Sequence, residues 1–308
     1  MSVDGGYAGW RAVEQAIKQA AKRAHEADPT REVEDIIRQA HHDRFLCRVF
    51  ADGTDEAWVI KGGAGMLARV ANTRRTQDIA LYREGRDKDE SLLELRRLAA
   101  ADLGDFFSFA YHFHTPIGGG DNQPNVDGYH VVFDASLGLK SLHPIQVDLA
   151  ASVFASVGVV EAEPANRLPL ARLVVFPYRL YPVANQIADK VTATVADYRG
   201  RPSSREKDLV DLVVLALTQT VRAEDVREAL ATECHLRGLP MPQTFAVPPT
   251  WGVGYARLAA RTPPAAAHAS VEAALALMRR FIAPVLDGRA RGSWDPSDQM
   301  WEQPILKA

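Results

Sequence analysis

The hydrophobic period of this chain changes near residue 180, and this change constrains the fold more than any other feature of the sequence. Before it, apolar side chains alternate with polar ones at 77–82 and 143–150, which is the two-residue period of strands, and a further strand is expected at 128–135. After Pro182 they recur at helical spacing. The helices expected there are 183–198, 204–220, 222–236, 252–260 and 268–285. The pattern predicts an α+β fold, with a mixed α/β domain over 1–180 and a mainly helical domain over 181–308.

The first domain is expected to begin with a helical prelude over 9–26 and 30–50. A strand at 57–60 then runs into Gly62-Gly63 and a short helix over 64–70. The remaining elements expected in this domain are a helix at 88–103 and strands at 106–114, 156–162 and 172–176. The last 20 residues are rich in glycine, proline and charge, and we expect them to form a surface tail.

The composition is that of a globular protein, with 308 residues, 47% hydrophobic and 24% charged. The net charge of −3 indicates no overall basic surface, so any contact with nucleic acid requires a local patch. No run of apolar residues reaches the roughly 18 that a membrane span needs, and no signal segment opens the chain. We therefore expect a cytoplasmic protein without a membrane partner.

Cysteine and histidine give no clear metal motif. Cys47 and Cys234 are far apart, which argues against a disulfide scaffold or a zinc site. The pairs His41-His42 and His112-x-His114 lack a third ligand at metal-type spacing. Histidine or cysteine ligation of a metal is not expected.

Two of the expected strands each carry one aspartate on an otherwise apolar ladder. In 77–82 the core face belongs to the isoleucine and leucine positions, so Asp78 shares the other face with Ala80. Asp148 has the same placement in 143–150. Two carboxylates on neighbouring strands repel each other unless a cation lies between them, and Mg²⁺ suits such a pair together with triphosphate oxygens. The alternative is that each aspartate is simply solvated at a sheet edge.

A glycine turn precedes the first of these strands. Gly62-Gly63 would open a helix, whose N-terminus favours an anion, and glycine lets a phosphate approach the backbone closely. A purely structural turn explains the same two residues.

Charged residues also occur at informative positions in the helical half. On 183–198 Lys190 lies at the shoulder of the buried stripe, from which it can reach a neighbouring cleft or extend along apolar surface to water. The helix 204–220 is apolar almost all round, so Asp208 and Asp211 should be buried and need a counter-charge from Lys190 or Arg205. A structural ion pair between two helices would meet that need as well.

Taken in order, these residues resemble the motifs of the nucleotidyltransferase superfamily related to DNA polymerase β, and within it the AbiEii/AbiGii and MenT toxins. The resemblance spans residues 60–215. It is carried by Gly62-Gly63, Arg74-x-Thr76-x-Asp78-Ile79, Asp148, Gln186-Ile-Ala-Asp-Lys190 and Arg205-Glu-Lys-Asp208-Leu-Val-Asp211.

The resemblance implies a mixed-sheet nucleotidyltransferase domain whose active-site cleft is closed by the helical domain. It implies Mg²⁺ at Asp78 and Asp148, and catalytic roles for Asp78, Lys190 and Asp211. Lys190 would bind the triphosphate, and Asp211 would orient Lys190 or an acceptor. The substrate-binding residues that it implies are Gly62, Gly63, Arg74, Thr76, Arg205 and Asp208.

The resemblance further implies a toxin of a toxin–antitoxin system, of a kind associated with phage defence and paired with a cognate antitoxin. Such an enzyme would transfer a nucleotide from a nucleoside triphosphate to an RNA acceptor, above all the 3′ end of tRNA. Three local clusters of cations could hold an RNA backbone. They are Lys18, Lys22 and Arg23, then Arg69, Arg74 and Arg75, then Arg199, Arg201, Arg205 and Lys207. A solvated loop explains the third cluster equally well.

One position departs from the superfamily pattern, which has Asp-x-Asp where this chain has Asp78-Ile79-Ala80. Three explanations remain open: a natural one-carboxylate variant, a degenerate relative, or an alanine introduced to silence a toxic enzyme. Ala80 also supports a different class of function, a silent nucleotidyltransferase-like module that binds nucleotide, RNA or protein. An enzyme that modifies small molecules is a third possibility.

Overall fold

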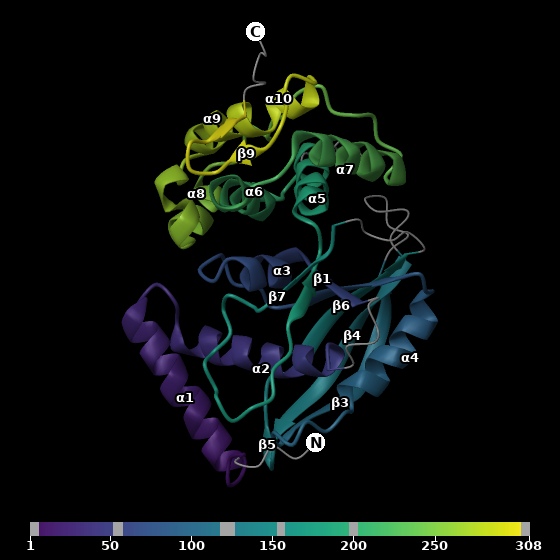
Figure 1. The fold of residues 1–308 in the computed structure, drawn as a ribbon, viewed down its shortest axis with the longest axis vertical. Helices are drawn as coiled ribbons and strands as arrows, with labels where there is room; N and C mark the ends of the chain where they lie inside the picture. Colours follow the sequence, from purple (N-terminus) through teal and green to yellow (C-terminus); the bar gives the residue numbers. More distant parts are fainter. Residues whose placement is uncertain (1–5, 52–57, 118–126, 153–157, 197–202, 303–308) are drawn as a thin grey trace. The chain divides into compact units, whose positions relative to one another are not determined.

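The computed structural model describes residues 6–51, 58–117, 127–152, 158–196 and 203–302 (Figure 1). Arg199 and Arg201 lie outside these ranges, as does the start of the strand expected at 156–162. Contacts divide the chain into two units. Unit 1 takes the chain up to Tyr181, and unit 2 takes the chain from Pro182 together with the short segment Asn72–Arg74.

Unit 1 is built on one mixed sheet with the strand order β3-β4-β6-β2-β1-β8-β7, and β5 pairs with β4. The pairs β2–β6 and β1–β8 are parallel, and the other pairs are antiparallel. The strands are β1 (Trp58–Lys61), β2 (Ile79–Glu84), β3 (Phe107–Ile117), β4 (Asp127–Leu137), β5 (Lys140–Ser141), β6 (Ile145–Ser152), β7 (Val160–Ala162) and β8 (Tyr178–Leu180). The expectation of a mixed sheet is confirmed.

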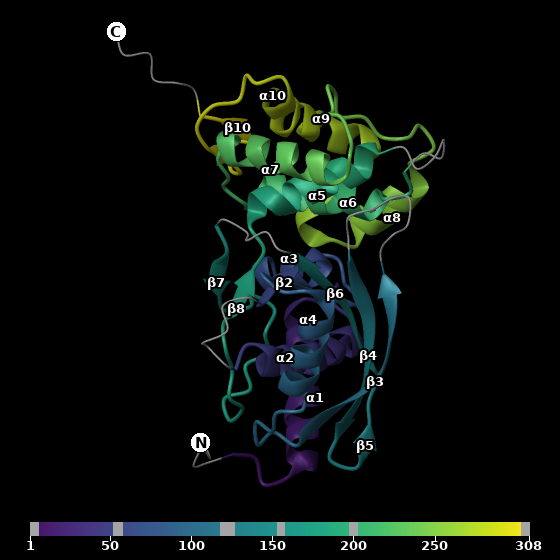
Figure 2. The same cartoon turned by 90° about the vertical axis from the view of Figure 1, so that its right-hand side faces the viewer.

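Helices α2 (Val33–Val49) and α4 (Lys88–Ala99) supply apolar side chains to the same core as the sheet, and α1 (Trp10–Ala27) packs along α2 (Figures 1 and 2). Strand residues such as Ile79, Leu81 and Val147 are fully buried in that core. Because side chains alternate along a strand, the residues between them belong to the opposite face of the sheet. Helix α3 (Gly62–Arg69) follows β1 without an intervening loop.

The strand expected at 172–176 is wrong, and buried arginines explain why. Arg44 donates to the carbonyl oxygen of Val174 at 2.8 Å, and Arg167 donates to that of Phe176 at 2.7 Å. The backbone of this apolar run is therefore satisfied by guanidinium groups instead of a strand partner. The strand that pairs with β1 is β8, which begins at Tyr178.

Unit 2 is helical around α6 (Glu206–Thr218), whose side chains from Leu209 to Ala216 are buried. This confirms the burial expected for 204–220. The other helices are α5 (Val183–Val195), α7 (Ala223–Leu236), α8 (Val253–Ala260), a 3₁₀ turn (Pro263–His268), α9 (Val271–Phe281) and α10 (Ala283–Leu286). None of the described helices in either unit has the length and apolar character needed to cross a bilayer.

The surface tail expected over the last 20 residues is wrong for its described part, up to Glu302. Two short strands, β9 (Trp294–Asp295) and β10 (Met300–Trp301), pair there. Their tryptophans are buried, and the Trp294 indole donates to the carbonyl oxygen of Ala216 on α6 at 2.7 Å. The Trp301 ring stacks on Phe281 at 5.9 Å between centroids. Aromatic burial anchors this segment despite its polar composition.

Candidate functional site

A row of four paired residues crosses the sheet of unit 1 on the face away from the core. In the strand register Lys61 of β1 lies opposite Ala80 of β2, Ala80 opposite Asp148 of β6, and Asp148 opposite His130 of β4. Directly paired residues point to the same face of a sheet. The row therefore places a cation, a methyl group, a carboxylate and an imidazole on neighbouring strands.

Asp78 lies one residue before β2 and not within it, so the strand begins later than the 77–82 expected. It precedes Ala80 by two residues, and the chain bends at Gln77 and Asp78. Asp78 therefore lies at the start of β2, beside the strand that carries Asp148.

His130 is a member of this row that the sequence analysis missed. Its Nδ1 lies 2.8 Å from Oδ1 of Asp148, and the two side chains are 29% and 44% exposed. A histidine held against a metal-binding carboxylate fixes the orientation of that carboxylate. The signal available in the sequence was a single histidine between the apolar residues Tyr129 and Val131 of the strand expected at 128–135.

Asp78 and Asp148 are the carboxylates that could hold a magnesium ion. Mg²⁺ is commonly bound by one or two carboxylates together with substrate phosphates and water. Within the described ranges no cluster of three or more histidine, cysteine or acidic side chains suits a metal. A carboxylate at position 80 would lie beside Asp148, so Ala80 removes a ligand from this donor set.

The glycine turn packs against the segments that carry Ala80 and Asp78. Gly62 has φ +63°, a conformation that favours glycine, and a Cβ there would lie 3.2 Å from Cβ of Ala80. A Cβ on Gly63 would lie 2.8 Å from Oγ1 of Thr76. That hydroxyl donates to the carbonyl oxygen of Asp78 at 3.1 Å. The turn thus has a structural reason for both glycines, and it also adjoins the carboxylates.

Unit 2 brings together five of the residues expected at the site. Lys190 Nζ of α5 lies 2.5 Å from Oδ2 of Asp211 and 3.1 Å from Oδ1 of Asp208, both on α6. Arg74 makes two contacts with Asp211, from Nε at 2.8 Å and Nη2 at 2.7 Å. Arg205 Nε lies 2.7 Å from Oδ2 of Asp208. The counter-charges expected for the buried carboxylates are present, and Arg74 is an additional one.

The charges of this cluster do not cancel, because three cations face two carboxylates and leave one positive charge. Burial by itself would raise the pKa of Asp208, but Lys190 and Arg205 hold it below its usual value. Asp211 is fully buried, whereas the side chains of Arg74 and Arg205 are 15% and 40% exposed. The cluster can therefore present cations to an anion while Asp211 stays inside. A structural ion-pair network between α5 and α6 would make the same contacts.

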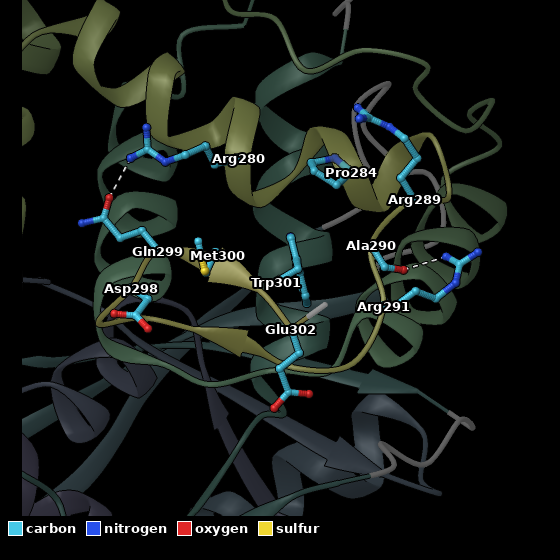
Figure 3. Close-up of a pocket in the computed structure, with 10 residues that line it drawn as sticks. All are labelled: Arg280, Pro284, Arg289, Ala290, Arg291, Asp298, Gln299, Met300, Trp301 and Glu302. Carbon is cyan, nitrogen blue, oxygen red and sulfur yellow. Dashed lines mark hydrogen bonds between the residues drawn. The ribbon is translucent and has the colours of Figure 1, made fainter. Parts of the chain in front are cut away.

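A separate pocket of about 660 Å³ lies in unit 2 beside β10 and α10 (Figure 3). Its lining includes Arg280, Arg289 and Arg291, but none of the residues expected at the site. Arg280 donates to Gln299 at 2.7 Å, Arg289 pairs with Asp287, and Arg291 donates to the carbonyl oxygen of Ala290. These arginines already have protein partners.

Comparisons with known proteins identify the family of the chain and structures of similar fold. The model of the AbiEii family, described as a nucleotidyl transferase toxin of a type IV toxin–antitoxin system, matches residues 44–277. Among solved structures, the MenT4 nucleotidyltransferase toxin of Mycobacterium tuberculosis is 16% identical, with TM-score 0.50 over 88% of this chain and 98% of its own. JHP933 from Helicobacter pylori is 12% identical, with TM-score 0.40 over 81% and 93%. No curated protein matches the chain. The likeness to MenT4 concerns the fold.

Proposed function

Since this chain belongs to the AbiEii nucleotidyl transferase toxin family of type IV toxin–antitoxin systems, we propose that it transfers a nucleoside monophosphate to the 3′ end of a tRNA. The observation that carries the proposal is the parallel pairing of β2 with β6, because Asp148 lies on β6 and Asp78 immediately precedes β2. In the reaction the 3′-hydroxyl of the acceptor attacks the α-phosphorus of a nucleoside triphosphate, and pyrophosphate leaves. The proton of the hydroxyl is lost to water.

Phosphoryl transfer requires mainly positioning and the neutralisation of charge. A magnesium ion held by Asp78 and Asp148 would supply neutralisation at the reacting phosphate. In the proposal, Lys190 and Arg74 bind phosphate oxygens, and Asp211, fully buried, positions both cations.

Five further residues complete the proposed substrate contacts. Arg205 adds a partly exposed cation, and Asp208 positions it together with Lys190. Gly62 and Gly63 offer backbone amides at the start of α3. Thr76 supports the backbone at Asp78 through its hydroxyl.

The acceptor and the partner follow from the family and from local charge. Toxins of this family act with a cognate antitoxin, and nucleoside triphosphates are their substrates. Exposed cations such as Lys18 and Lys22 on α1 could contact the backbone of a tRNA acceptor. Because tRNA and nucleoside triphosphates are cytoplasmic, the proposed reaction takes place there.

A second candidate function is favoured by Ala80. A methyl group directly opposite Asp148 weakens metal binding, which is what a silent nucleotidyltransferase-like module would require. Such a module would bind nucleotide or RNA without turnover.

Incubation with each α-labelled nucleoside triphosphate, magnesium and total tRNA separates these functions. We expect label on RNA, weak for the natural chain and stronger for Ala80→Asp. An Ala80→Asp/Asp148→Asn double variant is the matched control and should lose the gain. Label in neither the natural chain nor Ala80→Asp favours the module, and label on a soluble compound alone favours a small-molecule acceptor.

A further inference from the structure

One end of unit 1 is formed by the start of α1 and by the turn between β4 and β5 (Figures 1 and 2). Gly138 begins that turn with φ +56°, and a Cβ there would overlap the ring of Trp10. Its backbone N–H donates to the carbonyl oxygen of Phe106 at 2.9 Å. The next residue is Leu139. Three apolar residues from separate segments, Trp10, Phe106 and Leu139, therefore adjoin one glycine, and we call them the Gly138 patch.

Two side chains of the Gly138 patch are exposed to solvent, although both are strongly apolar. Leu139 is 92% exposed, more than any other large apolar side chain in the described ranges, and Phe106 is 42% exposed. Phe106 also has φ +64°, a conformation that aromatic residues rarely adopt. The third side chain, Trp10, is half-buried. Exposed apolar side chains that gather at one place are typical of an interaction site.

Cations adjoin the Gly138 patch. Lys140 ends the same turn with its side chain 46% exposed, and the Arg11 guanidinium lies 4.9 Å from the centroid of the Trp10 ring. Lys140 shares the carboxylate of Glu14 with Lys18, at 2.5 and 2.9 Å. No carboxylate of the described residues pairs with Arg11. Three cations therefore face one carboxylate, which leaves two positive charges beside the apolar side chains.

The carboxylates that precede Phe106 in the sequence do not reverse this balance. Asp105 is buried and pairs with Arg44 and Arg48 at 2.8 and 2.7 Å. Asp102 is exposed, and counting it with the patch still leaves one positive charge in excess. The surface around the patch is therefore complementary to an acidic partner.

The Gly138 patch is distant from the row of residues that includes Asp148. Leu137, the last residue of β4, is seven positions from His130, which pairs with Asp148. A strand rises about 3.4 Å per residue, so about 24 Å separates Leu137 from His130 along β4. A side chain of the patch therefore cannot contact a metal bound at Asp148.

We propose that the Gly138 patch docks a second protein, through a segment that carries both apolar and acidic side chains. Protein interfaces bury apolar side chains at their centre and pair charges at their rim. Leu139 and Phe106 would supply the first, and the uncompensated cations the second. An RNA fits less well, because an aliphatic side chain at the tip of a turn neither stacks on a base nor binds a phosphate. The inference goes beyond the proposed function, since docking at this end requires neither nucleotide nor metal.

A synthetic helical peptide with leucines on one face and glutamates on the other is a probe of this chemistry. Fluorescence anisotropy of the labelled peptide with the full chain should show binding that a peptide with lysines in place of the glutamates does not share. Leu139→Ser should weaken binding at least about tenfold, the effect of losing a central apolar contact. Lys140→Glu should weaken it by a similar factor and make it less sensitive to salt.

Leu93→Ser and Arg86→Glu are the matched controls. Leu93 is 64% exposed on α4 of the same unit. Arg86 is an exposed cation with a glutamate partner, Glu90 at 3.6 Å, as Lys140 is with Glu14. Both variants should bind the peptide as the natural chain does. All four positions are exposed, so circular dichroism should show the fold of the natural chain in each variant.

Absence of peptide binding, or equal losses in Leu139→Ser and Leu93→Ser, would overturn the inference. Binding of tRNA or of phosphatidylglycerol vesicles that Leu139→Ser abolishes, without binding of the peptide, would overturn it as well. The proposed nucleotide transfer would stand in each case. Leu139→Ser leaves the row at Asp148 intact and should label RNA as the natural chain does.

Discussion

Ala80 lies directly opposite Asp148 in the parallel register of β2 and β6. The pairing explains why one alanine matters in a chain of this family. A carboxylate at that position would lie on the strand next to Asp148 and two residues from Asp78, within reach of a shared cation. The same register places Lys61 on the other side of Ala80, so the charge balance of the row depends on this one residue.

His130 should matter for metal binding through Asp148. In an Ala80→Asp background, His130→Leu removes the Nδ1 contact at 2.8 Å and should weaken Mn²⁺ binding about tenfold, because the carboxylate loses its orientation. His112→Leu is the matched control, since His112 pairs with Asp134 at the same distance. Titration with Mn²⁺, followed by electron paramagnetic resonance, measures the metal affinity of the two variants. Equal losses in the two variants would contradict a specific role for His130.

Asp211 should be the most costly member of its cluster to neutralise. Asp211→Asn leaves Arg74 and Lys190 without their shared buried carboxylate and should lower the free energy of unfolding by about 3–5 kcal/mol. Lys190→Met should cost less, because Asp211 keeps Arg74 and Asp208 keeps Arg205. Urea unfolding of both variants shows which substitution lowers the free energy of unfolding more. A larger loss for Lys190→Met would show that the lysine dominates the network.

Replacing Gly62 should reveal the close approach of the glycine turn to β2. Gly62→Ala introduces a side chain at φ +63° and places its Cβ 3.2 Å from that of Ala80. Gly85→Ala serves for comparison, since Gly85 has φ +70° with open space around its Cβ position. Each substitution should cost about 1 kcal/mol of unfolding free energy from the backbone alone. Gly62→Ala should lower the unfolding free energy more than Gly85→Ala does, and it should also weaken triphosphate binding. Equal effects of the two substitutions on unfolding and on triphosphate binding would argue against this packing.

The stability of unit 1 should fall as the pH drops from about 6.5 to 4. Burial lowers the pKa of His41 and of His42 to about 4, so both stay neutral in the fold when the unfolded chain already binds protons. Protonation then favours the unfolded state, by about 2–3 kcal/mol for each histidine at the acid end. In His42→Gln the unfolding free energy should depend less steeply on pH over this range. His112→Gln, at a side chain 53% exposed, should leave the slope unchanged.

The elements that were predictable are those whose burial follows a simple period. Alternation in 143–150 correctly put Val147 in the core and Asp148 on the other face, and the apolar character of 204–220 predicted a buried helix. Period alone does not give register. That Ala80 pairs with Asp148 and Lys61 depends on the relative shift of three strands, which alternation leaves open.

Other features depended on partners that are distant in sequence. Arg74 lies in a loop, and its contact with Asp211 spans 137 positions, so no local pattern indicates it. Arg44 donates to the carbonyl oxygen of Val174, 130 positions away, in the run where a strand was expected. Trp294 is buried in a segment whose average composition is polar, because a single aromatic side chain can outweigh its neighbours.

Metal affinity tests the central claim most directly, that Asp78 and Asp148 form a metal site from which Ala80 removes one ligand. Mn²⁺ binding is measured by calorimetry on the natural chain, Ala80→Asp and Ala80→Asp/Asp148→Asn. The account predicts that Ala80→Asp binds at least about tenfold more tightly than the natural chain, and that the double variant loses this gain. An Ala80→Asp variant that binds no more tightly, or a gain that survives loss of the Asp148 carboxylate, would contradict it.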